Sequence, residues 1–448
     1  MPRLIVSSPS IVGTSGSDLV VGQEDNALPA IGIEVLENGV IETRGGNDTI
    51  KGSGTGGNDS EGDGTGIANS GIINAGKGDD TISGTGTGGF DYRFHSPGIG
   101  ISNTQGGYIN GGDGKDSIFG IGNYSYSLGI SFATGIQNTQ HSRIDGGKGD
   151  DSISGTGIGP ADAIGISNTE SSNINGGEGN DSISGTGTGS TDYSGGDGTG
   201  ISNSGGSVIS GGKGNDSITG IGKGSDAYLE PFRSFDAGNG IGISNSKGSI
   251  ISGGQGNDFI SGTGTGGEGV YDSPFGEVGP SVGTGIVNSG IISLGDGNDT
   301  IIGTGISQGI GFLNTNGIIC GGAGNDTLTG YGSSIGIQGG TIDGGSGNDY
   351  FKARRIDDSG NPVSDQGGAI ADVLIKGGFG ADTFDVGYGN ATIDGGCGWD
   401  KLILPDLKSD YTILGTSNNY TIQRDRFTLN VLNVEEIVFS GASSTLGT

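Results

Sequence analysis

The chain has 448 residues, of which 106 are glycine and 10 are proline, and it carries 50 acidic against 20 basic residues. Glycine does not recur at every third position and proline is scarce, which excludes a collagen triple helix. The formal net charge of −30 should repel nucleic acid and anionic membranes and attract cations. Apolar residues make up only 30%, but their regular spacing argues against disorder.

Residues 1–30 are expected to form an N-terminal segment and the first coil of a repeat. The opening Met-Pro-Arg-Leu-Ile-Val-Ser-Ser-Pro-Ser has too short an apolar stretch for a cleaved Sec signal peptide. No apolar run reaches the ~18 residues of a membrane span, so we expect no transmembrane segment.

Residues 31–402 are organised by a hexapeptide, Gly-Gly-x-Gly-[Asn/Asp]-Asp, followed two positions later by an apolar residue. Its aspartates, looser copies included, are Asp18, Asp48, Asp80, Asp116, Asp151, Asp181, Asp216, Asp258, Asp299, Asp326, Asp349, Asp382 and Asp400. This self-similarity is typical of a solenoid, whose stacked repeats bury a continuous narrow core.

A second landmark, Gly-Ile-x-Asn-[Ser/Thr] or a close variant, precedes eight motifs at Asn69, Asn103, Asn138, Asn168, Asn203, Asn245, Asn288 and Asn314. The distance from each asparagine to the next motif aspartate is 11–13 residues, whereas the distance from that aspartate to the following asparagine is 15–30. Each repeat therefore has a rigid half and a half that tolerates insertion. The asparagines are expected to form turns or a side-chain ladder, and the two interpretations are compatible.

In the rigid half, isolated isoleucines alternate with small polar residues, which predicts short strands with one buried face. The expected fold is all-β, a parallel β-solenoid with coils about 4.8 Å apart and a rod roughly 60 Å long.

The variable halves contain most of the Tyr, Phe, Pro and Arg residues outside the C-terminal region, in residues 90–95, 124–126, 228–233, 271–275 and 352–355. Because they leave the coil at the same phase, we expect these insertions to line one edge of the rod. They would contact a cell-surface polysaccharide or another surface protein, unless they are only tolerated decoration.

Residues 403–448 alternate apolar and polar side chains and lack the motif. We expect a small antiparallel β cap that covers the exposed strand edge of the last coil.

Glycine at the first, second and fourth motif positions permits positive φ angles and tight turns. Such turns expose carbonyl oxygens, and Ca²⁺ takes six to eight oxygen ligands, which two stacked turns would supply with the aspartates. We therefore predict multiple Ca²⁺ ions between coils; polar turns without metal are the alternative.

Other metals fit the motif less well. Mg²⁺ demands a stricter octahedron than Ca²⁺, and a Zn²⁺ site lacks ligands because the chain has only 2 His and 2 Cys. Cys320 and Cys397 are expected to be separate thiols.

The copies resemble the nonapeptide repeat of the RTX (hemolysin-type) calcium-binding proteins, G-G-x-G-x-D-x-U-x with U apolar. Residues 377–403 match best, as three successive nonapeptides. In that family the sixth-position aspartate and the glycine-turn carbonyls bind Ca²⁺ within a parallel β-roll. The middle nonapeptide has Ala391 at the aspartate position, so the resemblance implies no site there.

Most motifs are 30 to 42 residues apart, whereas a coil of the RTX roll contains two nonapeptides. This indicates a longer, three-sided coil with one calcium edge, similar to the long-repeat proteins common in cyanobacteria. The resemblance also implies export by a type I system that reads an uncleaved signal within residues 403–448, and folding on calcium outside the cell.

We therefore expect a calcium-dependent extracellular structural or adhesive protein rather than an enzyme. The alternatives are a β-helix enzyme such as a polysaccharide lyase or epimerase, and an ice- or mineral-binding solenoid, although the repeat reads mainly Gly-Thr-Gly rather than Thr-x-Thr. The only catalytic candidates, all weak, are Asp91, Tyr92, Arg93 and His95. Ser281 matches a G-x-S-x-G elbow but lacks its strand–helix context.

Overall fold

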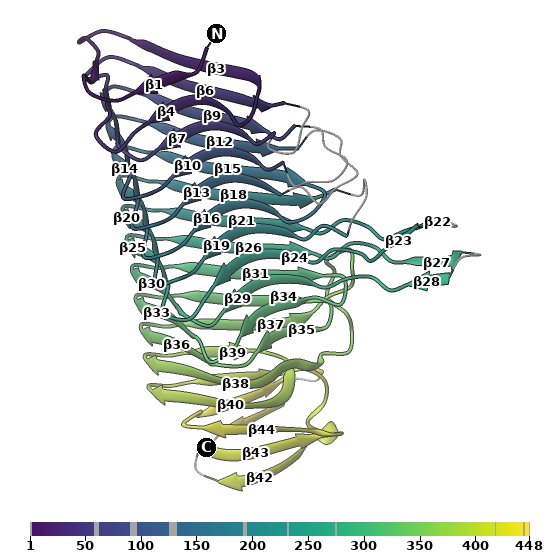
Figure 1. Ribbon diagram of the computed structural model, residues 1–448. Helices are drawn as coiled ribbons and strands as arrows, with labels where there is room; N and C mark the ends of the chain where they lie inside the picture. Colours follow the sequence, from purple (N-terminus) through teal and green to yellow (C-terminus); the bar gives the residue numbers. More distant parts are fainter. Residues whose placement is uncertain are drawn as a thin grey trace.

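The computed structural model describes residues 2–57, 62–89, 96–124, 132–190, 195–230, 233–273, 276–416, 418–441 and 444–447. Strands dominate these ranges and stack coil upon coil into an elongated rod (Figure 1). The helical content of the described ranges is one 3-10 turn, Lys408–Asp410. None of the described segments forms a helix long and apolar enough to span a membrane. The predicted all-β class is confirmed.

Each complete coil contains three strands, and each strand pairs in parallel with its counterpart in the next coil. We call the three stacks ladders 1, 2 and 3. Ladder 1 contains β1 (Leu4–Val6), β4 (Ala30–Val35), β7 (Gly64–Asn69), β10 (Gly98–Asn103), β13 (Ala133–Asn138), β16 (Ala163–Asn168), β19 (Gly198–Asn203), β24 (Gly240–Asn245), β29 (Gly283–Asn288), β32 (Ile310–Asn314) and β35 (Ile335–Gln338).

Ladder 2 contains β2 (Ile11–Val12), β5 (Val40–Glu42), β8 (Ile72–Lys77), β11 (Tyr108–Asp113), β14 (Arg143–Lys148), β17 (Asn173–Glu178), β20 (Val208–Lys213), β25 (Ile250–Gln255), β30 (Ile291–Asp296), β33 (Ile318–Ala323) and β36 (Thr341–Ser346). The long strands β38 (Gly367–Phe379) and β40 (Tyr388–Cys397) then run through both ladders 1 and 2.

Ladder 3 contains β3 (Leu19–Ala27), β6 (Thr49–Gly56), β9 (Thr81–Thr87), β12 (Ser117–Asn123), β15 (Ser152–Gly159), β18 (Ser182–Gly189), β21 (Ser217–Lys223), β26 (Phe259–Thr265), β31 (Thr300–Ile306), β34 (Thr327–Gly332), β37 (Tyr350–Arg355), β39 (Thr383–Asp385) and β41 (Lys401–Leu404). The motif turn joins ladder 2 to ladder 3. We number the coils 1 to 13 by their motif aspartates, from Asp18 to Asp400.

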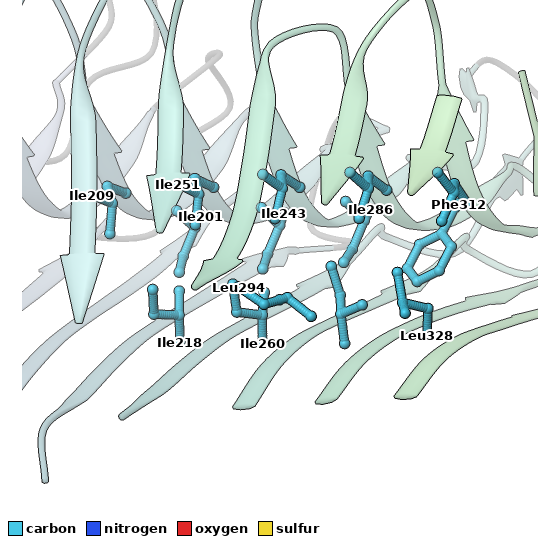
Figure 2. Close-up of a cluster of buried hydrophobic side chains, with 14 of the residues drawn as sticks. Ile201, Ile209, Ile218, Ile243, Ile251, Ile260, Ile286, Leu294, Phe312 and Leu328 are labelled. Atoms are coloured by element: carbon cyan, nitrogen blue, oxygen red, sulfur yellow. The ribbon is translucent and has the colours of Figure 1, made fainter. Parts of the chain in front are cut away.

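The core consists of three columns of apolar side chains, one from each ladder. Ile136 of β13 pairs with Ile166 of β16, and the same pairing of like residues recurs in ladders 2 and 3. Figure 2 shows these columns in successive coils; its labelled residues are Ile201, Ile209, Ile218, Ile243, Ile251, Ile260, Ile286, Leu294, Phe312 and Leu328, all buried. Repetition of one apolar position per strand therefore builds most of the core, and some strands add a second apolar residue, such as Leu294 of β30.

The interior is thin because ladders 1 and 3 approach each other backbone to backbone. A Cβ atom added at Gly185 of β18 would lie 2.2 Å from the carbonyl oxygen of Gly200 in β19. Real side chains do not reach this distance from backbone atoms, so the position of Gly185 has no room for a side chain. Its neighbour Thr186 points outward and pairs with Thr156 of the adjacent coil.

We expect Gly185→Val to destabilise the rod more than Thr186→Val, which adds no bulk to the interior. Overpacking a core costs about 1–3 kcal/mol, and here the obstacle is backbone, which cannot rotate away. Urea unfolding followed by circular dichroism would measure the difference. Equal midpoints for the two variants would contradict the expectation.

Two described insertions form hairpins between a ladder 3 strand and the ladder 1 strand of the next coil. They are β22 (Tyr228–Glu230) with β23 (Arg233–Phe235), and β27 (Val270–Ser273) with β28 (Gly276–Val278). Figure 1 shows both projecting from the same side of the rod, and β22 contacts β27. For these two insertions the predicted single edge is confirmed.

The C-terminal region is an antiparallel cap that also continues the solenoid. β42 (Thr412–Thr416), β43 (Asn419–Arg424) and β44 (Phe427–Leu432) form an antiparallel meander, and β45 (Glu436–Phe439) pairs antiparallel with β46 (Ser444–Gly447). However, β44 also pairs in parallel with β40, and β45 with β41. The cap thereby supplies a final partial coil, a continuity that the expected antiparallel cap did not include.

The Arg424 side chain packs on aromatic rings at the C-terminal end of the core. Its guanidinium lies 4.6 Å from the ring centroid of Tyr388 and 5.2 Å from that of Tyr411, and it forms an ion pair with Asp406. Cation–π contacts of this kind cover apolar rings while keeping the charge paired.

Candidate metal centre

The motif turn depends on two glycines with left-handed backbone angles. In coil 6, Gly177 and Gly179 have φ angles of 126° and 137°, which side chains rarely tolerate. Gly176, at the first position, does not have a positive φ, so the expectation for that position is wrong. A Cβ on Gly176 would instead meet the Oδ2 of Asp181 at 2.6 Å and the carbonyl oxygen of Gly211 at 2.4 Å. The first glycine thus leaves space beside the carboxylate.

The motif aspartates form one continuous hydrogen-bonded row along the rod. The N–H of Asp151 donates to Oδ1 of Asp181 at 2.7 Å, and the N–H of Asp181 donates to Oδ1 of Asp216 at 2.7 Å. The same contact, at 2.7–2.8 Å, joins every successive pair from Asp18 to Asp400. The sequence predicted this register, and the structure brings all thirteen residues together.

The second oxygen of these carboxylates is buried without a hydrogen-bond partner. This holds for the Oδ2 atoms of Asp48, Asp80, Asp116, Asp151, Asp181, Asp216, Asp258, Asp299, Asp326, Asp349, Asp382 and Asp400. Asp18 differs because its Oδ2 accepts the N–H of Thr14 at 2.6 Å. Buried polar atoms normally find partners, so twelve orphaned oxygens in one row indicate a ligand.

The first motif position holds a buried side chain in three coils, as Thr43, Ala75 and Leu294. The Oδ2 atoms of Asp48, Asp80 and Asp299 in those coils still lack partners. The free oxygen therefore does not require glycine at the first position, although the space around it differs there.

A protein family described as RTX calcium-binding nonapeptide repeat (4 copies) matches residues 139–157, 168–188, 245–264, 315–334, 341–354 and 374–403. These segments include the motif aspartates of coils 5, 6, 8, 10, 11, 12 and 13. The chain contains RTX calcium-binding nonapeptide repeats. A search of curated proteins finds no match.

RTX repeats bind calcium, so Ca²⁺ is the ion that these turns imply. Within the described ranges, no three His, Cys, Asp or Glu side chains form a metal-binding group. The orphaned Oδ2 atoms would therefore need backbone carbonyls of the glycine turns to complete the six to eight oxygens of a calcium shell. Hard oxygen donors of this kind fit Ca²⁺.

Burial raises the pKa values of the motif carboxyls from Asp80 to Asp400. The pKa reaches about 7 for Asp116 and Asp151, mainly because the carboxyls are removed from water, and neighbouring carboxylates add to the shift. The N–H donated by the preceding aspartate opposes it. The pKa of Asp181 and of Asp216 rises to about 6 for the same main reason. When no cation is bound, burial therefore favours the protonated form of these carboxyls.

In calcium-free solution we therefore expect acid to favour the folded state. The unfolded chain has ordinary aspartate pKa values of about 3.9, whereas the raised pKa values of about 6 for Asp181 and about 7 for Asp116 let these folded carboxyls retain protons to higher pH. Because these pKa values are raised on folding, their contribution is complete below about pH 4 and is lost as the pH rises through 6 and 7. Circular dichroism in chelator should show β structure appearing from pH 7 to pH 4. No gain of β structure over that range would contradict this.

A second row of hydrogen bonds runs through the fifth motif position. The N–H of Asn215 donates to Oδ1 of Asn180 at 2.8 Å, and the N–H of Asn257 donates to Oδ1 of Asn215 at 2.6 Å. These bonds run in the opposite direction to those of the aspartate row. The motif has Asn or Asp at this position in most coils, but the link between coils was not predicted from the sequence. The preference for short side chains with an acceptor oxygen was the available signal.

The asparagine landmark forms the predicted side-chain ladder. Nδ2 of Asn138 donates to Oδ1 of Asn168 at 2.8 Å, and Nδ2 of Asn168 donates to Oδ1 of Asn203 at 2.9 Å. Asn168 also donates to the carbonyl oxygens of Ser172 and Val208. The turn and ladder interpretations are therefore both correct.

The remaining candidates lie away from this row. Asp91, Tyr92, Arg93 and His95 fall outside the described residues, so their arrangement stays a prediction. Cys320 in β33 and Cys397 in β40 are free thiols, as expected. Ala391 lies buried in β40 and pairs with Val373 of β38.

Proposed function

We propose that this RTX protein is a calcium-dependent extracellular structural or adhesive rod. All thirteen motif aspartates, Asp18 included, are proposed to face a row of Ca²⁺ ions between coils. The observation that carries the proposal is the row of twelve buried, unpartnered Oδ2 atoms. With a net charge of −30, the chain would repel itself until cations neutralise that row.

Dependence on calcium suits a protein that works outside the cell. Extracellular calcium modules bind with Kd values of about 10⁻⁴–10⁻³ M, so such a rod would fold only after export. We propose that residues 31–402 are the calcium solenoid and that residues 403–448 combine the cap with a type I export signal.

Adhesion is assigned to the edge that carries the hairpins. Tyr228 in β22 is 40% exposed, and β22 pairs antiparallel with β23 in the projecting hairpin. An exposed aromatic side chain on a projecting hairpin offers a stacking surface to a polysaccharide or a surface protein.

The test combines calorimetric calcium titration with a glycan-array screen of the calcium-loaded protein. We expect multiple ions to bind and specific glycans to be retained in calcium and released in chelator. A Tyr228→Ala variant should lose retention while binding the same amount of calcium. Absence of calcium binding would refute the proposal as a whole, and unchanged retention by Tyr228→Ala would refute the assignment of adhesion to this edge.

A second candidate function is the binding of ice or a mineral by the outer face of ladder 3. The glycines of Gly-Thr-Gly face inward, so the outward residues read Ser-x-Ser-x-Thr, and Ser154 and Thr156 pair with Ser184 and Thr186. Such hydroxyls form a grid with steps of about 6.6–6.8 Å along a strand and about 4.8 Å between coils.

Ice recrystallisation assays would test this face. The folded protein should inhibit crystal growth, and a Thr156→Lys, Thr186→Lys double variant should lose the effect with its circular dichroism unchanged. A folded wild-type protein without inhibition would eliminate ice as the ligand.

A further inference from the structure

The row of motif aspartates ends on a glutamate that belongs to the cap. The N–H of Asp400 donates to Oε2 of Glu435 at 2.7 Å, as the N–H of Asp382 donates to Oδ1 of Asp400 at 2.8 Å. The following residue also keeps the register, because the N–H of Glu436 donates to the carbonyl oxygen of Asp400 at 3.0 Å. Glu435 therefore occupies the place of a fourteenth aspartate.

The turn that carries Glu435 has none of the motif glycines. In this turn, the carbonyl oxygen of Asn433 lies 2.0 Å from the position that an added Cβ atom would take on Gly395. In the coil before, the carbonyl oxygen of Gly395 lies 2.4 Å from the corresponding position on Gly377. Asn433 thus presents its carbonyl in register, and the longer glutamate side chain compensates for the shorter turn.

Two buried oxygen atoms at this junction lack partners. Asp400 is fully buried, and its Oδ2 has no hydrogen-bond partner. This Oδ2 lies 2.6 Å from the place that a Cβ atom would take on Gly395, and the carbonyl oxygen of Asn433 approaches the same place. Asn418, in the turn between β42 and β43, donates Nδ2 to Oε1 of Glu435 at 2.7 Å, while its own Oδ1 is buried without a partner. Carboxylate, amide and backbone oxygens are the ligands that Ca²⁺ takes.

We propose that Asp400 and Glu435 hold a terminal calcium ion between coil 13 and the cap. This inference rests on the proposed calcium row and extends it to a ligand outside the motif. The ion neutralises the negative charge at the end of the row and fastens the cap to the rod. Docking of the cap therefore depends on calcium, although the cap contains no RTX repeat.

The test uses Glu435→Gln in the full-length chain, with Glu436→Gln as the matched control. Glu436 is the adjacent glutamate, and its Oε2 lies 3.8 Å from Nζ of Lys401 rather than beside Asp400. Calorimetry should show one ion fewer, or one ion bound at least tenfold more weakly, for Glu435→Gln alone. Hydrogen exchange should show that residues 411–439 of this variant need more calcium for protection, while coils 5 to 8 keep the wild-type calcium requirement.

Tryptophan-sensitised terbium luminescence gives a local readout. Trp399 is the one tryptophan in the chain, precedes Asp400 and is 61% exposed. Terbium, which replaces calcium at oxygen sites, should give less luminescence in Glu435→Gln than in the wild type and in Glu436→Gln. The second variant, Glu435→Asp, keeps the charge but is one methylene shorter, and should give an intermediate calcium affinity with a cap that docks at saturating calcium.

Equal ion number, affinity and cap protection in Glu435→Gln and the wild type would overturn the terminal site. So would equal luminescence in all variants. If the wild type bound no calcium at all, the proposed function would fail instead, which keeps the two failures distinguishable.

Discussion

Removal of calcium is expected to unfold most of the rod. In chelator at pH 7, far-ultraviolet circular dichroism should show a largely unfolded chain, and millimolar calcium should restore β structure. One unpaired buried polar group costs about 1–3 kcal/mol, and twelve lie in one row. Against a typical net stability of about 5–15 kcal/mol, the row cannot remain both ionised and unliganded in a folded protein.

Magnesium at the same concentration is the control for this experiment. It prefers a strict octahedron and retains its waters, so it should restore little β structure. A folded spectrum that persists in chelator at pH 7 would contradict the dependence on calcium.

Asp181→Asn is expected to have the largest effect among single substitutions in the rod. The asparagine keeps an acceptor for the N–H of Asp151, which donates to Asp181 Oδ1 at 2.7 Å, but it removes one carboxylate, a proposed calcium ligand, from the middle of the row. Breaking a buried ion pair on one side costs about 3–5 kcal/mol. We expect a loss of that order at saturating calcium, measured by urea unfolding, with a raised calcium midpoint.

Asp150→Asn is the matched control, since it removes the same charge one position from a motif aspartate. Asp150 is exposed, and its Oδ1 accepts the N–H of Asn180 at 2.8 Å. Other coils already have asparagine at this position, so the change should be nearly neutral. If both variants lost similar stability, overall charge rather than the buried row would be the cause.

The fold was predictable because its signals are local and repeated. The apolar residue two positions after each motif aspartate, such as Ile153 and Ile183, faces the core in the structure. The constant spacing from asparagine to aspartate likewise predicted that Asn138, Asn168 and Asn203 would stack. The pattern of one coil therefore predicts the contacts that recur in every coil of the stack.

The candidate site was predictable only in part. Its aspartates share a register that the sequence displays, but part of the reason for Gly176 is the close approach of Gly211 in the next coil, which cannot be inferred from a single repeat. Glu435 does not fit the motif because its turn lacks the glycines. Its role depends on the contact with Asp400, 35 residues earlier in the chain.

By itself, therefore, the sequence determined the repeat, the strand alternation, the calcium chemistry and the change of character after residue 402. These follow from side-chain chemistry and spacing within one repeat. The tertiary structure alone decided which carboxylate oxygens are orphaned, how the fifth-position amides link coils and where the aspartate row ends. These features arise between atoms of different coils, which only the stacking of the rod brings within contact distance.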